Sequence, residues 1–321
     1  MPLALRRLLY PLFGPTISIV HQFHRPPYGG GNQFLLALMN EFRRRDQDVG
    51  ARHIGPRTRY VLFNSFNFDM ENLRARLQNR HLTGIRTLHR VDGPISAYRG
   101  QDIHVDKAIL SINRELADVT VFQSNFSRNK HQELGLEMHN GHVILNAADP
   151  QIFHSRGRVP FPRDGARRIR LVASSWSPNR RKGADVYEWL DQNLDFRRFE
   201  LTFVGNSPSK FRNILKLEPV PSKELGEILR QHDIYIAASV NDPCSNALIE
   251  ALACGLPALY RRSGGHPEIV GEAGCGFDEA EEIPSLVDRL IEDYEAVRGR
   301  IALPSIADVA ARYLTLLTAK S

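Results

Sequence analysis

The two residues with the clearest chemical potential in this 321-residue chain are Asp242 and Glu250, which stand eight positions apart. Asp242 precedes a proline and so disfavours helix, whereas Ser245 or Asn246 can cap the apolar helix that follows. The free amides at the start of that helix would bind a pyrophosphate. Glu250 lies among apolar residues, where a lone carboxylate is costly unless it accepts hydrogen bonds from hydroxyl groups. A ribose offers two such hydroxyls side by side.

Strand and helix patterns alternate along the chain around this segment. Strands are predicted at residues 16–20, 60–63, 84–89, 119–122, 143–145, 169–173, 199–204, 234–236 and 258–260. Helices are predicted at residues 33–45, 184–193, 223–230, 246–254 and 306–320. This alternation is typical of α/β proteins with parallel sheets covered on both faces, which bind ligands at the carboxyl ends of their strands.

The pattern is interrupted once. Residues 154–168 combine two prolines, two glycines and five arginines without periodicity, and we interpret them as an interdomain linker. Two Rossmann-like domains are therefore expected, at residues 1–158 and 159–305, followed by a C-terminal helix at 306–321.

Five motifs occur in one order along the chain. They are the acidic pair itself, Ser124–Phe126, Val143–Phe153, Arg181–Gly183 and Gly264–Val270. Together they resemble retaining GT-B glycosyltransferases of the E-x7-E type (glycosyltransferase family 4-like, glycosyl transferases group 1), here in a D-x7-E form. The resemblance implies two Rossmann-like domains facing each other across a cleft, with the C-terminal helix able to return to the first domain. It also implies metal-independent transfer of a hexosyl group from a UDP- or GDP-linked sugar to an acceptor hydroxyl, in polysaccharide or glycolipid biosynthesis.

The resemblance further assigns roles to single residues. Asp242 would hold a sugar hydroxyl and, with His89, form the catalytic pair. The donor would be bound by Arg181, Lys182, Cys244, Ser245, Asn246, Glu250 and Gly265. The acceptor side would comprise Gly30, Gly31, Asn32, Arg90 and Asp92. The chain departs from the family at Ser174–Trp176, where an arginine usually follows the strand, and either Arg180 or Arg181 is a candidate to replace it.

Several alternatives stay open. His89 can equally be a structural histidine, and Arg90 and Asp92 can pair with each other. A nucleotide-sugar 2-epimerase shares the fold, and a catalytically silent nucleotide-sugar-binding subunit is consistent with the missing arginine. A metal site is not expected, because His21 and His24 lack a third ligand. A dinucleotide site is disfavoured because the glycines at 29–31 lack the G-x-G-x-x-G order.

Composition bears on where the protein acts. Three cysteines without CxxC spacing suit reduced thiols, and no apolar run is long enough to span a bilayer, so the cytoplasm is expected. Residues 1–160 hold 21 basic and 13 acidic residues, whereas residues 161–321 hold 21 and 23. A basic first half favours a phosphorylated or lipid-linked acceptor and peripheral contact with the anionic inner face of the membrane. Nucleic acid is disfavoured, because no basic stretch is interleaved with aromatic residues.

If the basic half contacts a membrane, the protein should co-sediment with anionic liposomes and not with neutral ones. Binding should weaken as salt rises, because the Debye length falls to about 3 Å at 1 M. The segment Met1–Phe13, with leucines around Arg6 and Arg7, is a further candidate for this contact. Equal sedimentation with both lipids would contradict the prediction.

Overall fold

The structure is a computed structural model that describes residues 10–27, 29–66, 68–162 and 165–319. It consists of two compact α/β units. Unit 1 contains the described residues up to His24, Leu35–Asn146 and those from Ser305 onwards. Unit 2 contains Arg25–Phe34 and Ala147–Pro304. Most of the predicted membrane-contact segment Met1–Phe13 lies outside the described residues.

Unit 1 is built on a six-stranded sheet in the order β2-β1-β3-β4-β5-β6, with every neighbouring pair parallel. Its strands are β1 (Ile17–Val20), β2 (Val49–Ala51), β3 (Tyr60–Phe63), β4 (Arg86–Val91), β5 (Val119–Phe122) and β6 (Gly141–Val143). Its helices are α2 (Tyr10–Phe13), α3 (Gly30–Arg44), α4 (Met70–Leu77), α5 (Arg80–Thr83), α6 (Ile95–Arg99), α7 (Ile103–Leu116), α8 (Asn125–Glu133) and α15 (Ile306–Thr318).

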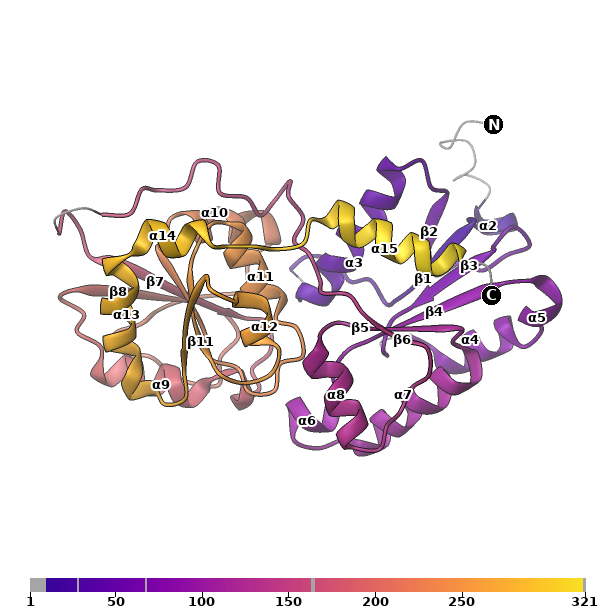
Figure 1. Cartoon of the computed structure of the whole chain (residues 1–321), viewed down its shortest axis with the longest axis horizontal. Coiled ribbons are helices and arrows are strands. Elements are labelled where there is room, and N and C mark those ends of the chain that lie inside the picture. The colour runs from indigo at the N-terminus through magenta and orange to yellow at the C-terminus, as the bar shows by residue number, and fades with distance from the viewer. Residues whose placement is uncertain (1–9, 28, 67, 163–164, 320–321) are drawn as a thin grey trace. The chain divides into compact units, whose positions relative to one another are not determined.

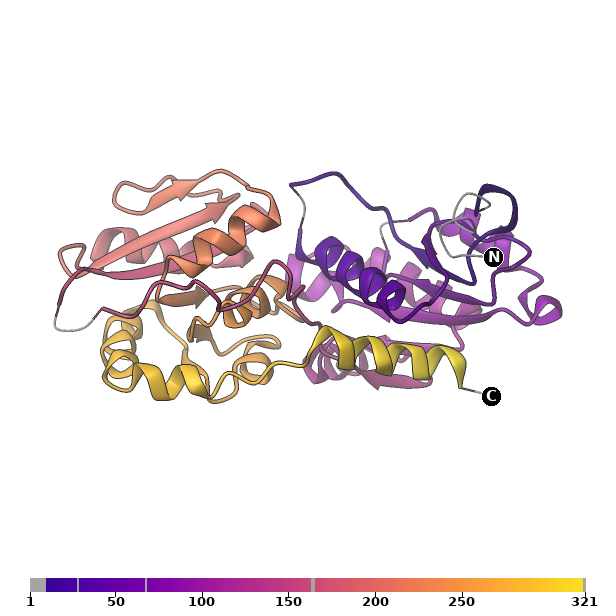
Figure 2. The same cartoon turned by 90° about the horizontal axis from the view of Figure 1, so that it is seen from above.

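Successive side chains of these strands point to opposite faces of the sheet, so apolar side chains form a core on each face. Val61 and Phe63 pack with Leu73 of α4 and Ile112 of α7, so Leu62 points to the opposite face. Figure 1 shows α3 and α15 on that opposite face, and in Figure 2, seen from above, both lie on its near side. Right-handed crossovers explain why α3 and the helices α4, α7 and α8 cover opposite faces of the sheet. The connection through α3 leads from β1 to β2 at one edge, whereas the connections through α4, α7 and α8 lead toward β6 at the other edge.

Unit 2 repeats this architecture with a parallel sheet in the order β12-β11-β10-β7-β8-β9. Its strands are β7 (Ile169–Ser175), β8 (Phe199–Gly205), β9 (Leu215–Leu217), β10 (Ile234–Ala237), β11 (Ala258–Arg261) and β12 (Gly274–Phe277). Its helices are η1 (Arg180–Lys182), α9 (Ala184–Asn193), α10 (Ser222–Arg230), α11 (Asn246–Ala253), α12 (His266–Val270), η2 (Ala280–Glu282), α13 (Ile283–Glu292) and α14 (Tyr294–Gly299). The core of one face is formed by α9 and α13 against β7, β8 and β10.

The predicted α/β class with two Rossmann-like domains is confirmed, whereas some local expectations were wrong. No strand was predicted at β2, β9 or β12, which have only three or four residues each. Gly30 and Gly31, expected in a loop, form the first turn of α3. The segment 154–168, interpreted as a linker, is held on unit 2, where Arg167 makes a bidentate ion pair of 2.6 and 2.8 Å with Asp233. Within the described ranges, no helix is both long and apolar enough to span a bilayer.

Candidate functional site

The apolar helix predicted after Asp242 is α11, and its start agrees with the sequence. Ser245 has extended backbone angles and its hydroxyl accepts a hydrogen bond of 3.4 Å from the amide of Leu248, so it is the N-cap. Asn246 is the first helical residue, and the helix closes on Gly255 at a φ of +84°. The amide of Cys244 donates to Asp242 Oδ1 at 3.3 Å. The loop therefore places the carboxylate of Asp242 beside the N-terminus of α11.

Glu250 lies one turn further along α11 and has an exposed fraction of only 7%. Among the described residues, none forms a hydrogen bond or ion pair with its carboxylate. Burial therefore raises the pKa of Glu250 to about 8. The side chain faces a cavity of ≈ 70 Å³ lined also by Ser174 and Ser175 at the carboxyl end of β7 and by Gly205 at that of β8. The carboxyl group of Glu250 is therefore buried without a hydrogen-bond partner among the described residues. It lies at the carboxyl ends of the strands, where parallel sheets bind ligands.

Lys182 and Asp242, two of the predicted site residues, are brought into direct contact. Lys182 Nζ lies 2.7 Å from Asp242 Oδ2, and the lysine side chain keeps 34% of its surface exposed. Burial raises the pKa of Asp242, but the charge of Lys182 and hydrogen bonds from Lys182 and the Cys244 amide outweigh it. The pKa of Asp242 therefore lies below its ordinary value, and the acid is ionised at neutral pH.

The two arginines beside Lys182 differ in their surroundings. Arg180 forms a bidentate pair with Glu188, at 3.1 and 2.9 Å, so its guanidinium is held by that carboxylate. Arg181 has an exposed side chain, and its backbone carbonyl accepts from the amide of Val240. Of the two candidates for the family's missing arginine, Arg180 is therefore the one already engaged by a carboxylate.

Two further residues behind Asp242 were not selected from the sequence. Ser239 Oγ lies 3.3 Å from Asp242 Oδ2 and 3.0 Å from His266 Nε2. His266 is fully buried, burial lowers its pKa, and its Nδ1 lies 3.1 Å from the carbonyl oxygen of Arg261. Since a carbonyl only accepts, Nδ1 carries the hydrogen and Nε2 of the neutral ring faces the hydroxyl. The only sequence signal was the position of His266 in the motif Gly264–Val270.

The loop between β11 and α12 contains two glycines that allow it to pack closely against Asp242. Gly264 has a φ of +65°, and a Cβ there would stand 2.2 Å from the carbonyl oxygen of Asp242. Gly265, the predicted site residue, donates its amide to that same carbonyl at 2.9 Å. The steric requirement for glycine thus falls on Gly264.

Gly29 and the glycines at the start of α3 belong to unit 2. A Cβ on Gly30 would lie 2.3 Å from Cβ of Asn246, and one on Gly29 would lie 3.0 Å from the ring of Trp176. Gly31 has open space around its Cβ position, and Asn32 is buried with an exposed fraction of 6%. Gly30, Gly31 and Asn32 were assigned to the acceptor side, but the structure groups them with unit 2. Gly30 packs directly on the start of α11.

In unit 1 the predicted residues Arg90 and Asp92 belong to a buried polar network. Arg90 is fully buried, and its guanidinium donates to Asn64, to Asn146 at 3.1 Å and to Asp92 at 3.2 Å. The side-chain amide of Gln123 also donates to Asp92. The network joins the carboxyl ends of β3, β4 and β5. Asn146 falls within the motif Val143–Phe153, whereas Asn64 and Gln123 carried no sequence signal, since isolated amides after strands are common.

His89 differs from the expectation. It was expected to end its strand, but β4 continues to Val91, and the side chain is fully buried. Its ring stacks on Phe63 at 4.2 Å between centroids, and Nδ1 lies 3.0 Å from Asn113 Nδ2. Burial lowers the pKa of His89 to about 3, so the ring is neutral at pH 7. These contacts are those of a core histidine, and we leave His89 out of the proposed machinery.

The raised pKa of Glu250 makes stability depend on pH. Between pH 4.5 and about 8 the folded chain keeps a proton on Glu250 that the unfolded chain has released, so the free energy of unfolding falls as pH rises. The Glu250→Gln variant should lose this dependence, which amounts to up to about 1.4 kcal/mol per pH unit. Urea denaturation of ligand-free protein at several pH values measures it. The exposed Glu227 of α10 supplies the control, Glu227→Gln, which should titrate like the unmodified chain.

Comparison with known proteins finds similarities over part of the chain. Residues 172–293 match the family model for glycosyl transferases group 1. D-inositol 3-phosphate glycosyltransferase of Corynebacterium glutamicum is 25% identical, over 50% of this chain and 37% of its own length. N-acetyl-alpha-D-glucosaminyl L-malate synthase of Bacillus anthracis is 23% identical, over 64% of this chain and 60% of its own. The chain thus spans less than two thirds of either relative.

The fold itself is shared with solved structures. HepE of Anabaena, solved in complex with UDP-glucose, superposes with a TM-score of 0.64 at 14% identity, over 94% of both chains. Taken together, the chain has the GT-B fold of glycosyltransferases, and its residues 172–293 are similar to the family of glycosyl transferases group 1.

Proposed function

We propose that this protein is a retaining glycosyltransferase. It transfers a hexosyl group from a UDP- or GDP-linked sugar to an acceptor hydroxyl, in the synthesis of a polysaccharide or glycolipid. The observation that carries this proposal is the buried, unpartnered carboxylate of Glu250 in unit 2, beside the ion pair of Lys182 and Asp242. A ribose diol, a diphosphate and a sugar hydroxyl are the groups that these three side chains suit. The family match of residues 172–293 and the UDP-glucose complex of HepE support the same reading.

Donor binding would exchange the partners seen in the free protein. The ribose hydroxyls donate to Glu250, which favours its ionised form and lowers its pKa on binding. The diphosphate takes the ammonium of Lys182 away from Asp242, and Arg181 is near enough in the chain to assist. Asp242 then accepts a hydroxyl of the donor sugar. Ser239 and the Cys244 amide keep the acid in place after the lysine has moved.

The reaction breaks the bond between the anomeric carbon and the diphosphate oxygen, and the diphosphate leaves with the electron pair. The acceptor oxygen forms its bond to that carbon on the face from which the diphosphate departs, and its proton passes to the departing diphosphate oxygen. Negative charge builds on the leaving diphosphate, so a lysine already aimed at it and the amides at the start of α11 lower the barrier. We propose that these groups act without a metal ion. Activity should then persist in EDTA.

The donor site is tested by nucleotide binding. Glu250→Gln keeps the shape of the side chain but loses charge-assisted acceptance from the ribose, and should weaken UDP or GDP binding by on the order of 1.5 to 3 kcal/mol. Isothermal titration calorimetry measures this, with the exposed Glu227→Gln as the matched control. The unmodified protein should also release a proton on binding near pH 7, visible as a heat that varies with the buffer's ionisation enthalpy. Unchanged affinity in a folded Glu250→Gln protein would remove Glu250 from the site.

A turnover assay distinguishes the proposed glycosyltransferase from an epimerase and from a silent binding subunit. The protein is incubated with UDP-glucose or GDP-mannose and a panel of glycan and lipid-linked acceptors, with and without EDTA, and the product anomer is assigned by NMR. A retained α-linkage in the presence of EDTA is expected. An inverted linkage, or activity lost in EDTA and restored by Mg²⁺, contradicts the mechanism. Conversion of the donor to its C2 epimer identifies an epimerase, and nucleotide-sugar binding without any turnover identifies a silent binding subunit.

A further inference from the structure

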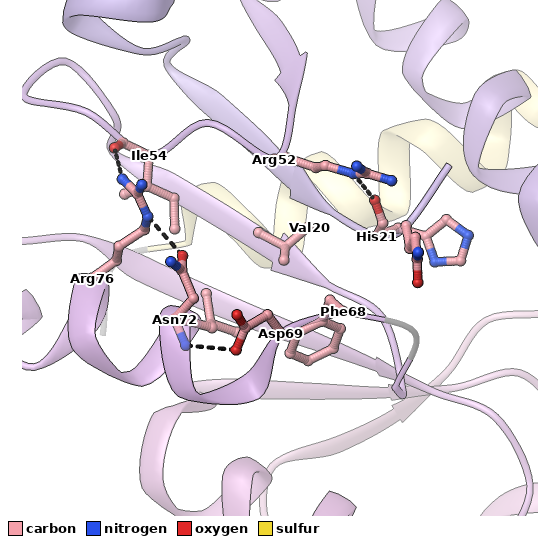
Figure 3. Close-up of a pocket in the computed structure, with 10 residues that line it drawn as sticks. Val20, His21, Arg52, Ile54, Phe68, Asp69, Asn72 and Arg76 are labelled. Carbon is pink, nitrogen blue, oxygen red and sulfur yellow. Dashed lines mark hydrogen bonds between the residues drawn. The ribbon is translucent and has the colours of Figure 1, made fainter. Parts of the chain in front are cut away.

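Unit 1 contains a cavity of ≈ 320 Å³ that none of the sequence motifs predicted (Figure 3). It lies where β1 and β2 end and α4 begins: Val20 is the last residue of β1, Arg52 directly follows β2, and Asp69 caps α4. The carboxyl edge of a parallel sheet is where such folds bind ligands. The cavity shares no residue with the network of Arg90 and Asp92. Its size matches the lower end of the range for small-molecule sites, about 300 to 1,000 Å³.

The cavity has an apolar floor and a polar rim. The floor consists of the buried side chains of Val20, Ile54 and Leu73 together with the ring of Phe68. The rim carries two arginines, Arg52 and Arg76, which approach from different elements (Figure 3). An apolar surface with a few polar groups around it suits the ring face of a sugar, whose hydroxyls and charged substituent then reach the rim.

The two arginines are fixed in place by neutral oxygens. Arg52 donates from Nε to the carbonyl of His21 at 2.9 Å and from Nη2 to that of Phe23 at 3.2 Å. Arg76 donates from Nε to Asn72 Oδ1 at 2.8 Å and from Nη1 to the carbonyl of Ile54 at 3.2 Å. Holding the side chains before a ligand arrives reduces the entropy that binding must overcome.

Neither guanidinium has a carboxylate partner among the described residues, in contrast to other arginines of the same unit. Arg57 pairs with Asp48 at 3.0 Å, and Arg80 pairs with Asp118 at 2.7 Å. The one acid in the cavity, Asp69, accepts the amide of Asn72 at 2.9 Å and so serves as the N-cap of α4. The cavity therefore presents two positive charges and one partly engaged negative charge, an excess of one positive charge.

We propose that this cavity binds an anionic sugar residue of the acceptor, with its ring on Phe68 and Leu73. Because Arg52 and Arg76 stand at opposite ends of the cavity (Figure 3), the phosphate or carboxylate group binds one of them and the sugar hydroxyls bind the other. This inference rests on the proposed function and names the chemical class of the acceptor. The shared chemistry is a hexose that carries one acidic group. A phosphorylated sugar and a uronate both meet it, and the guanidinium fork accepts either group.

The test measures binding to the whole protein in the absence of any nucleotide. NMR titrations with glucose 6-phosphate, glucuronate, glucose and inorganic phosphate are carried out on the unmodified protein and on Arg52→Gln, Arg76→Gln and Arg59→Gln. Arg59 is the matched control, because it is exposed, bonds to the Pro56 carbonyl at 3.1 Å and lines no part of this cavity. We expect an acidic sugar to bind at least tenfold tighter than glucose or phosphate alone. The tighter of the two acidic sugars identifies the acid group.

The cavity variants should each weaken that binding at least tenfold, while Arg59→Gln leaves it unchanged. Arg52→Lys, which keeps the charge, should restore part of the affinity and shows that a loss in Arg52→Gln is not a folding defect. UDP binding should be the same in all variants, so failure here is separate from failure of the donor site. Equal binding of acidic sugars by the cavity variants and the unmodified protein, or binding of inorganic phosphate as tightly as glucose 6-phosphate, would overturn the proposal.

Discussion

Parallel pairing of the strands is the constraint on which both units depend. In each six-stranded sheet all strands run in one direction, so the segments that follow them meet at the same edge. In unit 2 this brings Ser175 at the end of β7, Asp242 after β10 and Gly264 after β11 into one neighbourhood, although they are far apart in the chain. In unit 1 the same edge gathers the network of Arg90 and the cavity with Arg52. Each sheet thus brings polar side chains from distant parts of the chain together at the carboxyl ends of its strands.

The two units treat buried charge in opposite ways. In unit 1, Arg90 is surrounded by Asn64, Asn146 and Asp92, so its charge is compensated and the network can hold the strand ends rigid. In unit 2, Glu250 is buried with no such compensation. A chain selected for stability alone would replace that carboxylate, and a group that destabilises the free protein is characteristic of a binding site. Lys182 and Asp242 are an intermediate case, since each satisfies the other until a ligand arrives.

The sequence was sufficient where local signals were strong. The helix 184–193 and the strands 60–63 and 119–122 were predicted with their observed bounds, because their apolar residues repeat at the spacing of helix or strand. The short strand β9, Leu215–Leu217, has a lysine at its centre and is stabilised mainly by pairing with β8. Burial of His89 could not be foreseen, because it depends on Asn113 and Phe63 from other elements. The burial of Glu250 was foreseen because an acid within an apolar helix is conspicuous without any tertiary information.

The division of the chain has a consequence for engineering. Unit 2 is not a contiguous stretch: Arg25–Phe34, which includes the glycines packed on Trp176 and Asn246, groups with Ala147–Pro304 and is separated from it by most of unit 1. A chimera that grafts residues 147–304 from a homologue would therefore pair a foreign α11 with the original Gly30, whose position tolerates no Cβ beside Asn246. Such a chimera should therefore exchange Arg25–Phe34 and Ala147–Pro304 together.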